Sequence, residues 1–274
     1  MDGREFRVAR LFGEGRRVVI VAMDHGLFNG IYKGLEDLPT AAEHTLTSDA
    51  DGLLVAPGMF PHIAPALAYR GAPVGIVRLL WNSVYRFSGD NTVAPSSKIM
   101  SPEAAVAAGA DWVLAGLTIG LSEEQDARNV ELFSECVERA HRIGVPIIGE
   151  YYPNIEGLSP EDVHGVIAEG ARAVAELGAD AIKTYSTIRF SEITAGVPIP
   201  VLGLGAEKTP HEIDALRLAR RIIDQGARGV VFGRNVFQAA DPGTFLAALC
   251  DVVKGGAAPE DAAARRGLEV VAPA

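Results

Sequence analysis

Eight short apolar runs recur along the chain, and amphipathic stretches separate them. Each run is apolar at consecutive positions, which is typical of strands covered on both faces of a parallel sheet. The runs are Val18–Met23, Gly52–Val55, Val74–Val77, Trp112–Leu114, Pro146–Glu150, Ala181–Lys183, Pro200–Gly203 and Gly229–Phe232. Regular alternation of such runs with helical stretches predicts βαβ units and parallel pairing.

The intervening stretches carry helix start and stop signals. Ser159–Leu177 has apolar residues near one face and opens with Ser159-Pro160-Glu161-Asp162, which predicts an N-terminal cap. Ser122–His141 and Thr209–Gln225 show similar periodicity, and the second is expected to begin with Thr209-Pro210. Turns such as Gly178-Ala179-Asp180 join helix to strand, because glycine tolerates the left-handed conformation just beyond a helix end.

Eight such units in 274 residues match a closed (β/α)₈ or TIM barrel. No linker or low-complexity tract divides the chain, so we expect residues 1–274 to form a single domain. An open doubly wound sheet is the alternative, but no Gly-x-Gly-x-x-Gly follows the first run. The longest irregular stretch, Trp81–Met100, is expected to be a βα loop over the site. Its aromatic residues Trp81, Tyr85 and Phe87 are expected to pack, with a role in specificity as the alternative.

The composition limits the kinds of partner that the protein is expected to bind. A net charge of −10 argues against broad binding to nucleic acid or anionic membranes, since both need a basic face. No run approaches the roughly 18 apolar residues of a membrane span, and Met1–Arg10 lacks the apolar core of a signal peptide. Cys136 and Cys250 match no metal spacing, and the histidines are scattered. We therefore expect a soluble cytoplasmic protein with no metal site.

Function in a barrel collects at the carboxyl ends of the strands. The residues expected there are Asp24-His25, Glu150-Tyr151-Tyr152, Lys183, Gly203-Leu204-Gly205-Ala206 and Gly233-Arg234-Asn235.

Lys183 ends an apolar run beside the expected barrel axis. An unpaired buried ammonium is costly, and a lysine commonly avoids that cost by losing its proton. A neutral amine is a nucleophile towards carbonyls, and the iminium that it forms is an electron sink. The alternatives are a lysine paired with a carboxylate such as Asp24, or one that points outward. Tyr152 suits proton transfer beside an iminium, or packing on Pro153 at the barrel rim.

Glycines recur after the last two runs. Gly203, Gly205 and Gly233 allow backbone N–H groups to approach an anion, and Arg234 adds a charge-assisted donor. Because the loops after strands seven and eight are the recurrent phosphate site of barrel enzymes, they predict a phosphate site here. Turns also favour glycine, so a purely structural role is the alternative.

Taken together, these motifs resemble the archaeal-type class I fructose-bisphosphate aldolase family, which includes the aminodideoxyheptulosonate synthases and the autoinducer-2 phosphate thiolases. The resemblance covers nearly the whole chain. It rests on Ala22-Met23-Asp24-His25-Gly26, Tyr152-Pro153, Ile182-Lys183-Thr184 and Gly233-Arg234-Asn235-Val236-Phe237-Gln238.

The resemblance implies that Lys183 is the Schiff-base lysine, that Tyr152 transfers protons and that Asp24 positions substrate hydroxyls. It further implies that substrate or its phosphate is bound by the residues His25, Gly203, Gly205, Gly233 and Arg234. It implies no metal or other cofactor, a small phosphorylated carbonyl substrate, and a homo-oligomer, often a decamer.

The family motifs Tyr-Pro-Arg-Gly and Ser-Gly-Gly become Tyr152-Pro153-Asn154-Ile155 and Leu204-Gly205-Ala206. A substrate with one phosphate, or another acceptor aldehyde, therefore fits as well as a bisphosphate. Three functions remain open: an aldolase with dihydroxyacetone phosphate or a similar ketone as donor, a transaldolase, synthase or thiolase, and a non-catalytic sugar-phosphate-binding barrel. The Tyr152-Pro153 pair favours the aldolase.

Overall fold

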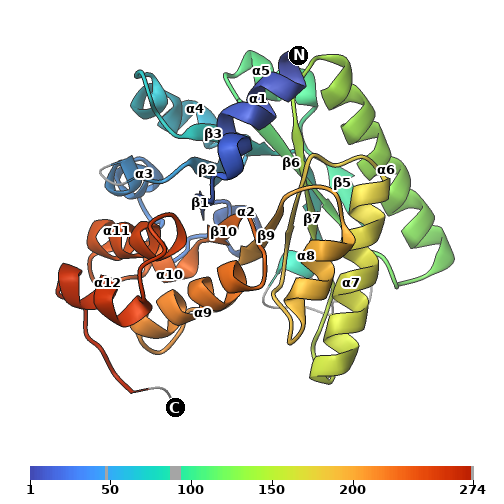
Figure 1. Cartoon of the computed structure of the whole chain (residues 1–274). Coiled ribbons are helices and arrows are strands. Elements are labelled where there is room, and N and C mark those ends of the chain that lie inside the picture. Colours follow the sequence, from blue (N-terminus) through green and yellow to red (C-terminus); the bar gives the residue numbers. More distant parts are fainter. Residues whose placement is uncertain (47–48, 87–93, 273–274) are drawn as a thin grey trace.

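A closed barrel of parallel strands forms the centre of the computed structural model, which describes residues 1–46, 49–86 and 94–272 (Figure 1). The barrel strands are β1 (Val18–Ala22), β2 (Gly52–Val55), β3 (Val74–Arg78), β6 (Trp112–Leu117), β7 (Ile147–Tyr151), β8 (Ala181–Thr184), β9 (Val201–Leu204) and β10 (Gly229–Phe232). They pair in the order β1-β10-β9-β8-β7-β6-β3-β2. The predicted TIM barrel is confirmed, and every predicted run overlaps one of its strands.

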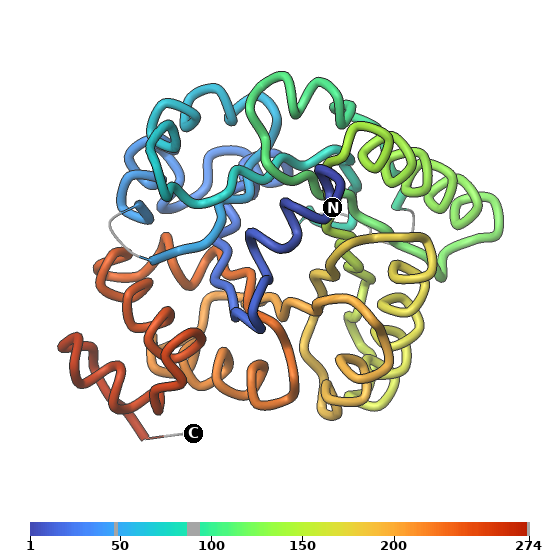
Figure 2. Tube along the Cα trace, turned by 45° about the horizontal axis from the view of Figure 1, so that its top comes forward, coloured from blue at the N-terminus to red at the C-terminus, as the bar shows by residue number. Residues whose placement is uncertain are grey.

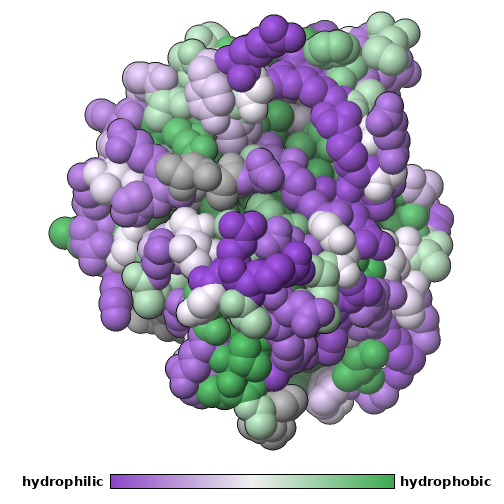
Figure 3. All heavy atoms as spheres, turned by 60° about the vertical axis from the view of Figure 1, so that its left-hand side comes forward, coloured by the Kyte–Doolittle hydropathy of each residue, from purple (hydrophilic) through white to green (hydrophobic). Residues whose placement is uncertain are grey.

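Helices surround this barrel. The longer ones are α3 (Leu38–Leu46), α6 (Glu123–Arg142), α7 (Pro160–Glu176), α9 (Glu212–Asp224), α11 (Pro242–Val253) and α12 (Pro259–Arg266). The shorter ones are α2 (Gly26–Asn29), α4 (Phe60–Ile63), α5 (Pro102–Ala107), α8 (Phe190–Gly196) and α10 (Arg234–Phe237). Hydrophilic residues predominate on the face of the molecule in Figure 3, with separate hydrophobic patches between them. The helices therefore direct most of their apolar residues inward, against the sheet.

The N-terminal helix α1 (Gly3–Phe12) closes one end of the barrel. Figure 2 shows this dark blue segment across the middle of the ring of helices. Leu11 and Phe12 join the core inside the barrel, and the Phe12 ring meets the Trp112 ring edge-on, with centroids 5.8 Å apart. Because α1 closes this end, the carboxyl ends of the strands form the open end where ligands can enter.

Two predicted helix starts have different outcomes. Ser159 caps α7 as expected, because its Oγ accepts a hydrogen bond from the Asp162 backbone N–H at 3.2 Å. The prediction that the next long helix begins with Thr209-Pro210 is wrong, since α9 begins at Glu212. The backbone N–H and the hydroxyl of Thr209 both donate to Asn235 Oδ1, at 2.9 and 3.1 Å. The Asn235 side chain therefore holds Thr209 in the loop, outside the helix.

The stretch Trp81–Met100 is more regular than predicted. It contains most of a two-stranded antiparallel sheet, β4 (Leu80–Asn82) with β5 (Ser96–Lys98). Asn82 Nδ2 stabilises this sheet by donating to the Ala94 carbonyl at 2.8 Å, a contact between distant positions that local periodicity does not reveal. Phe87 lies outside the described residues.

The core contains both cysteines. Cys136 on α6 and Cys250 on α11 are buried and free. Burial raises the pKa of each thiol to about 12, so neither has the character of a reactive thiolate. In the part of the chain that the structure describes, none of the helices combines the length and apolar character that crossing a bilayer requires.

Candidate active site

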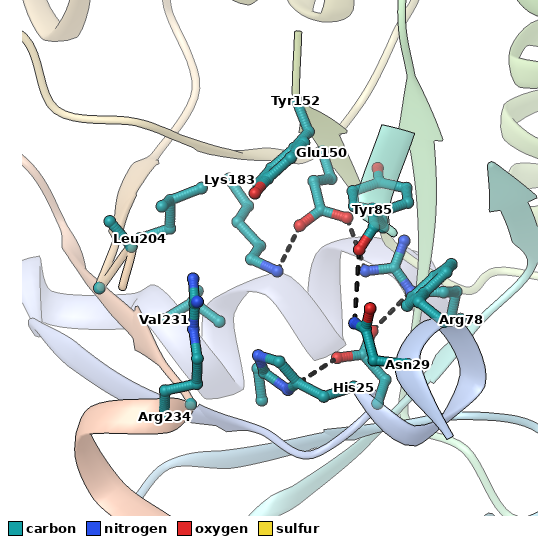
Figure 4. A pocket seen from close by; sticks show the side chains of 16 residues that line it. His25, Asn29, Arg78, Tyr85, Glu150, Tyr152, Lys183, Leu204, Val231 and Arg234 are labelled. Carbon is teal, nitrogen blue, oxygen red and sulfur yellow. Dashed lines mark hydrogen bonds and ion pairs between the residues drawn. The ribbon is translucent and has the colours of Figure 1, made fainter. Parts of the chain in front are cut away.

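A cavity of about 550 Å³, counted to its open mouth, lies at the carboxyl ends of the strands (Figure 4). It collects nearly all of the predicted site residues from five strand ends. Those that line it are Asp24, His25, Tyr152, Lys183, Gly205, Gly233 and Arg234. In Figure 4, Arg234 and Arg78 lie on opposite sides of Lys183. The cavity therefore has two chemically different walls.

Gly203 is not among the residues that line the cavity, and its part in a phosphate site stays a prediction. It pairs with Val230 inside the barrel sheet. A Cβ atom at this position would lie 2.6 Å from Ile222 Cγ2 on α9. The glycine is therefore needed for close packing of strand and helix, which is the structural alternative that the sequence left open.

Lys183 has a carboxylate partner. The register of β7 and β8 places Glu150 directly beside Lys183, and Glu150 Oε1 forms an ion pair with Lys183 Nζ. The Glu150 side chain is 2% exposed and the Lys183 side chain is 8% exposed, so the pair is almost completely removed from water. The sequence left open a pairing with Asp24, but the partner is Glu150.

Arg78, at the end of β3, joins the two buried carboxylates. Its Nε donates to Asp24 Oδ2 at 2.5 Å, and its Nη2 donates to Glu150 Oε2 at 2.6 Å. Burial acts to raise the pKa of Asp24, but Arg78 and Lys183 outweigh it and lower this pKa to about 2. Burial also acts to raise the pKa of Glu150, but the same two cations lower this pKa below its ordinary value. Both side chains are therefore carboxylates at neutral pH.

Aromatic rings form the wall next to this network. The Arg78 guanidinium lies 4.6 Å from the Tyr85 ring centroid, within cation–π range. Tyr85, Tyr152 and Tyr185 follow one another, with 4.9 Å between successive ring centroids. Burial raises the pKa of Tyr152, although a hydrogen bond from Tyr185 acts to lower it. Tyr152 is therefore a protonated hydroxyl at the cavity edge, able to donate as well as accept a hydrogen bond.

Glycines at the opposite wall allow close packing of the loops. A Cβ atom at Gly233 would lie 2.5 Å from His25 Cε1, and one at Gly205 would lie 2.8 Å from the Phe232 ring. Asn235 Nδ2 donates to the Gly205 carbonyl at 3.0 Å, which joins the loop after β9 to α10. Arg234 points into the cavity on this side (Figure 4).

His25 lines the cavity and lies between the two walls, in the lower part of Figure 4. Burial lowers its pKa to about 4, although the neighbouring Asp24 acts in the opposite direction. The imidazole is therefore neutral at pH 7 and offers one donor and one acceptor nitrogen. Its Nδ1 is buried 4.0 Å from Asp24 Oδ1 and has no hydrogen-bond partner among the residues that the structure describes.

The chemistry of the cavity follows from these two walls. One wall presents an amine beside a carboxylate and a tyrosine hydroxyl, and the other presents an arginine beside two glycine-containing loops. A ligand with a carbonyl group at one end and an anionic group at the other matches both walls.

Arg78, Glu150 and Tyr185 have no predicted role at the site. Arg78 lay just beyond a predicted strand that ended at Val77, and Glu150 was placed at a strand end without a role. A charged residue that ends an apolar run was the available signal in both cases. Tyr185 had no such signal, because its position beside Tyr152 depends on the packing of neighbouring loops.

Known proteins resemble this chain over most of its length. The family model described as DeoC/LacD family aldolase matches residues 18–239. The 2-amino-3,7-dideoxy-D-threo-hept-6-ulosonate synthase of Halobacterium salinarum is 32% identical over 271 residues, covering 98% of each chain. The 3-hydroxy-5-phosphonooxypentane-2,4-dione thiolase of Yersinia pestis is 33% identical over 257 residues, covering 92% of this chain and 82% of the relative.

A solved structure of an aldolase has a similar fold. A Schiff-base-forming fructose-1,6-bisphosphate aldolase superimposes with a TM-score of 0.76 at 26% identity, covering 90% of this chain and 98% of the other. The family match extends over most of the barrel, and the sequence relatives align over nearly the whole chain. The chain is therefore a member of the DeoC/LacD family of aldolases.

Proposed function

We propose that this chain is a class I aldolase that makes or cleaves a ketose phosphate through a Schiff base on Lys183. Dihydroxyacetone phosphate or a similar ketone is the donor. The observation that carries the proposal is the position of Lys183 Nζ inside the cavity, next to a carboxylate and across from Arg234. A nucleophilic amine and a cationic wall are the two groups that a phosphorylated ketone requires.

In the cleavage direction, Lys183 attacks the keto carbon and forms an iminium with loss of water. The C3–C4 bond of the ketose then breaks, its electrons move into the iminium, and an enamine remains on the lysine. Tyr152 shuttles the proton: its hydroxyl gives a proton to the enamine carbon and regains one from the C4 hydroxyl, so the tyrosine ends in its original form. Asp24 orients the neighbouring hydroxyl groups. The phosphate lies against Gly205, Gly233 and Arg234. The lysine itself supplies the electron sink, so the sequence of steps uses no metal or added cofactor.

An adjoining cavity supports a substrate with one phosphate. It shares Tyr152, Ala206 and Arg234 with the first cavity. Glu156 and Glu207 line it together with Arg86, so acidic side chains offset its positive charge. Such a mixture binds a second dianionic group poorly, whereas it accommodates a polar aldehyde.

Borohydride reduction in the presence of dihydroxyacetone phosphate tests the proposal. We expect a stable adduct in the intact mass, mapped by peptide analysis to Lys183, and no adduct in Lys183→Ala. Lys98→Ala is the matched control, because Lys98 also pairs with a glutamate, Glu135, at 2.7 Å but on the surface. Folded wild-type protein that gives no adduct contradicts the proposed donor.

The same trapping experiment separates the alternatives. A synthase or thiolase like the two relatives forms the adduct but turns over only when a second acceptor, such as an amino-aldehyde or coenzyme A, is present. A binding barrel is stabilised by the sugar phosphate without an adduct or turnover. Assembly as a homo-oligomer and a cytoplasmic location stay predictions, and light scattering measures the first.

A further inference from the structure

We propose that Tyr185 is a positioning residue for the reaction, which donates a hydrogen bond to the Tyr152 hydroxyl and holds this group in place beside Lys183. The proposal rests on the proposed Schiff-base function and adds to it the group that supports the proton-transferring tyrosine. Tyr185 acts on the reacting atoms only through Tyr152.

The two tyrosines lie at neighbouring strand ends. β7 and β8 pair in parallel, and Tyr152 and Tyr185 each follow directly after the last residue of their strand. The two ring centroids lie 4.9 Å apart, with 39° between the ring planes, and a hydrogen bond joins the hydroxyl groups. Tyr152 lines both the cavity with Lys183 and the adjoining cavity, and Tyr185 lines the adjoining one. Tyr185 therefore reaches Tyr152 from the adjoining cavity.

Thr184 fixes the spacing of the two tyrosines. Its Oγ1 donates a hydrogen bond to the backbone carbonyl of Tyr151 at 3.0 Å, and its side chain is completely buried. This bond ties the residue before Tyr185 to the residue before Tyr152. A side chain held by rigid elements keeps its geometry better than one on an unsupported loop, so the contact between the rings is a built feature of the barrel rim.

Helix α7 anchors the loop that begins with Tyr185. His164 of α7 is buried, and its Nδ1 lies 2.8 Å from Thr187 Oγ1, two residues beyond Tyr185. The same helix packs against the ring of Tyr151 at the end of β7. Both tyrosines of the site are therefore held through one helix as well as through the sheet.

The hydrogen bond between the hydroxyl groups has a defined direction. Burial and the neighbouring Tyr152 raise the pKa of Tyr185 well above its ordinary value, whereas the same hydrogen bond acts to lower the pKa of Tyr152. Tyr185 is therefore the donor and keeps its own proton throughout. Between giving a proton to the enamine carbon and regaining one from the C4 hydroxyl, the Tyr152 oxygen is negatively charged. Hydrogen bonds to a charged oxygen are stronger than those to a neutral one, so the donation favours this step.

Other neighbours of Tyr152 are less suited to this role. The Tyr85 ring also lies 4.9 Å from the Tyr152 ring, but its hydroxyl lies directly against Gly116 of β6, where a Cβ atom would overlap with it. Thr118 Oγ1 donates to the backbone carbonyl of Tyr152 at 3.3 Å and so holds the main chain. Tyr185 is the neighbour whose hydroxyl meets the Tyr152 hydroxyl.

The rate at which deuterium from D₂O enters dihydroxyacetone phosphate tests this role. The carbon next to the ketone takes up deuterium when Tyr152 protonates the enamine, so NMR of the donor measures the Tyr152 step without an acceptor aldehyde. Tyr185→Phe keeps the ring but lacks the donor hydroxyl, and we expect uptake at saturating donor to be about 10–100-fold slower than in wild type. Borohydride trapping on Lys183 should continue at close to the wild-type rate. Tyr151→Phe is the matched control and should keep both wild-type rates.

A double substitution distinguishes positioning from a structural role. Because Tyr185 acts through the Tyr152 hydroxyl, Tyr185→Phe should cause no further slowing of deuterium uptake in a Tyr152→Phe background. A purely structural contribution would add to the effect of Tyr152→Phe, or would raise the donor concentration needed for half-maximal uptake and leave the saturated rate unchanged. Either of these results overturns the inference.

Tyr185→Met keeps the experiment decisive if the phenylalanine variant does not fold, because it also lacks the hydroxyl and should slow uptake at least as much. Uptake at the wild-type rate in either folded variant overturns the role of Tyr185 and leaves the Schiff base intact. Uptake at the wild-type rate in Tyr152→Phe overturns the proton transfer by Tyr152 as well. Absence of an adduct on Lys183 in wild type overturns the proposed donor itself, so these failures are distinguishable.

Discussion

At the scale of single residues, two buried carboxylates and two buried cations set the chemistry of the cavity. Removing one such charge leaves its partner uncompensated in a region with little water, which is strongly destabilising in proteins. Arg78 limits that cost by bonding to Asp24 and Glu150 at once. Substitutions that preserve size and hydrogen bonding therefore disturb this site least, and a truncation such as Lys183→Ala requires a control that the variant is folded.

Tyr152→Phe is expected to separate the steps of the reaction. Loss of the hydroxyl removes the proton transfer at the breaking C–C bond, so cleavage of a ketose phosphate should slow by about 10²–10⁴-fold. Adduct formation with dihydroxyacetone phosphate should continue at close to the wild-type rate, because it depends on Lys183. Single-turnover assays with and without borohydride measure the two rates.

The control for this variant lies next to it in the chain. Tyr151 points away from the cavity and packs under Gly170 of α7, so Tyr151→Phe should leave the cleavage rate unchanged. Cleavage by Tyr152→Phe at the wild-type rate would show that another group carries the proton.

At the scale of elements, the contact between β7 and α7 positions two candidate site residues. β7 ends in Glu150 and Tyr151, and Tyr152 follows directly. The Tyr151 ring packs against α7 only because Gly170 has no side chain, since a Cβ atom there would lie 2.0 Å from the ring. A glycine that is unfavourable for helix propensity is therefore required by packing, and it holds the strand that carries Glu150.

Two glycines on α7 give a matched prediction. Gly170→Ala should lower the free energy of unfolding by about 1–3 kcal/mol, because overpacking against Tyr151 exceeds the gain in helix propensity. Gly165→Ala, at an exposed position with no atom within 4 Å, should raise it by up to about 1 kcal/mol. Urea unfolding followed by circular dichroism measures both. Equal effects of the two substitutions would contradict the packing argument.

At the scale of the whole molecule, closure of the barrel brings together residues from distant parts of the chain. Asp24, Arg78, Glu150 and Lys183 come from β3, β7, β8 and the turn after β1, and they meet at one end of the barrel. Stability and the candidate site are therefore coupled, because folding creates the pairings that keep these groups charged and His25 neutral.

This coupling predicts a stepwise loss of stability in acid. The pKa of His25 falls from 6.5 to about 4 on folding, mainly through burial. Between these values the unfolded chain binds a proton that the folded protein excludes, so the free energy of unfolding should fall as the pH drops from about 6.5 to about 4. The loss from this group is on the order of 3 kcal/mol. Asp24, whose pKa falls from 3.8 to about 2, should add a further loss below about pH 4.

Urea unfolding at a series of pH values, with wild type and His25→Gln in parallel, measures these contributions. The variant lacks the titrating imidazole, so its free energy of unfolding should change less between pH 6.5 and 4 and still fall below pH 4. An identical pH dependence in the two proteins would show that His25 is not the group responsible.

The sequence by itself determined the alternation of strands and helices, and with it the barrel. These features depend on periodicity and turn chemistry within a few residues, which any stretch of the chain carries locally. The same reasoning placed Lys183, Tyr152 and Asp24 at strand ends, because in a barrel the carboxyl ends of parallel strands meet at one rim.

Only the tertiary structure decided which of these residues touch. The bridge from Arg78 to Asp24 and Glu150, the outward packing of Gly203 against α9, and the late start of that helix all depend on contacts between distant positions. Such contacts follow from strand register and from the space left by neighbouring side chains, and neither has a local signature in the sequence.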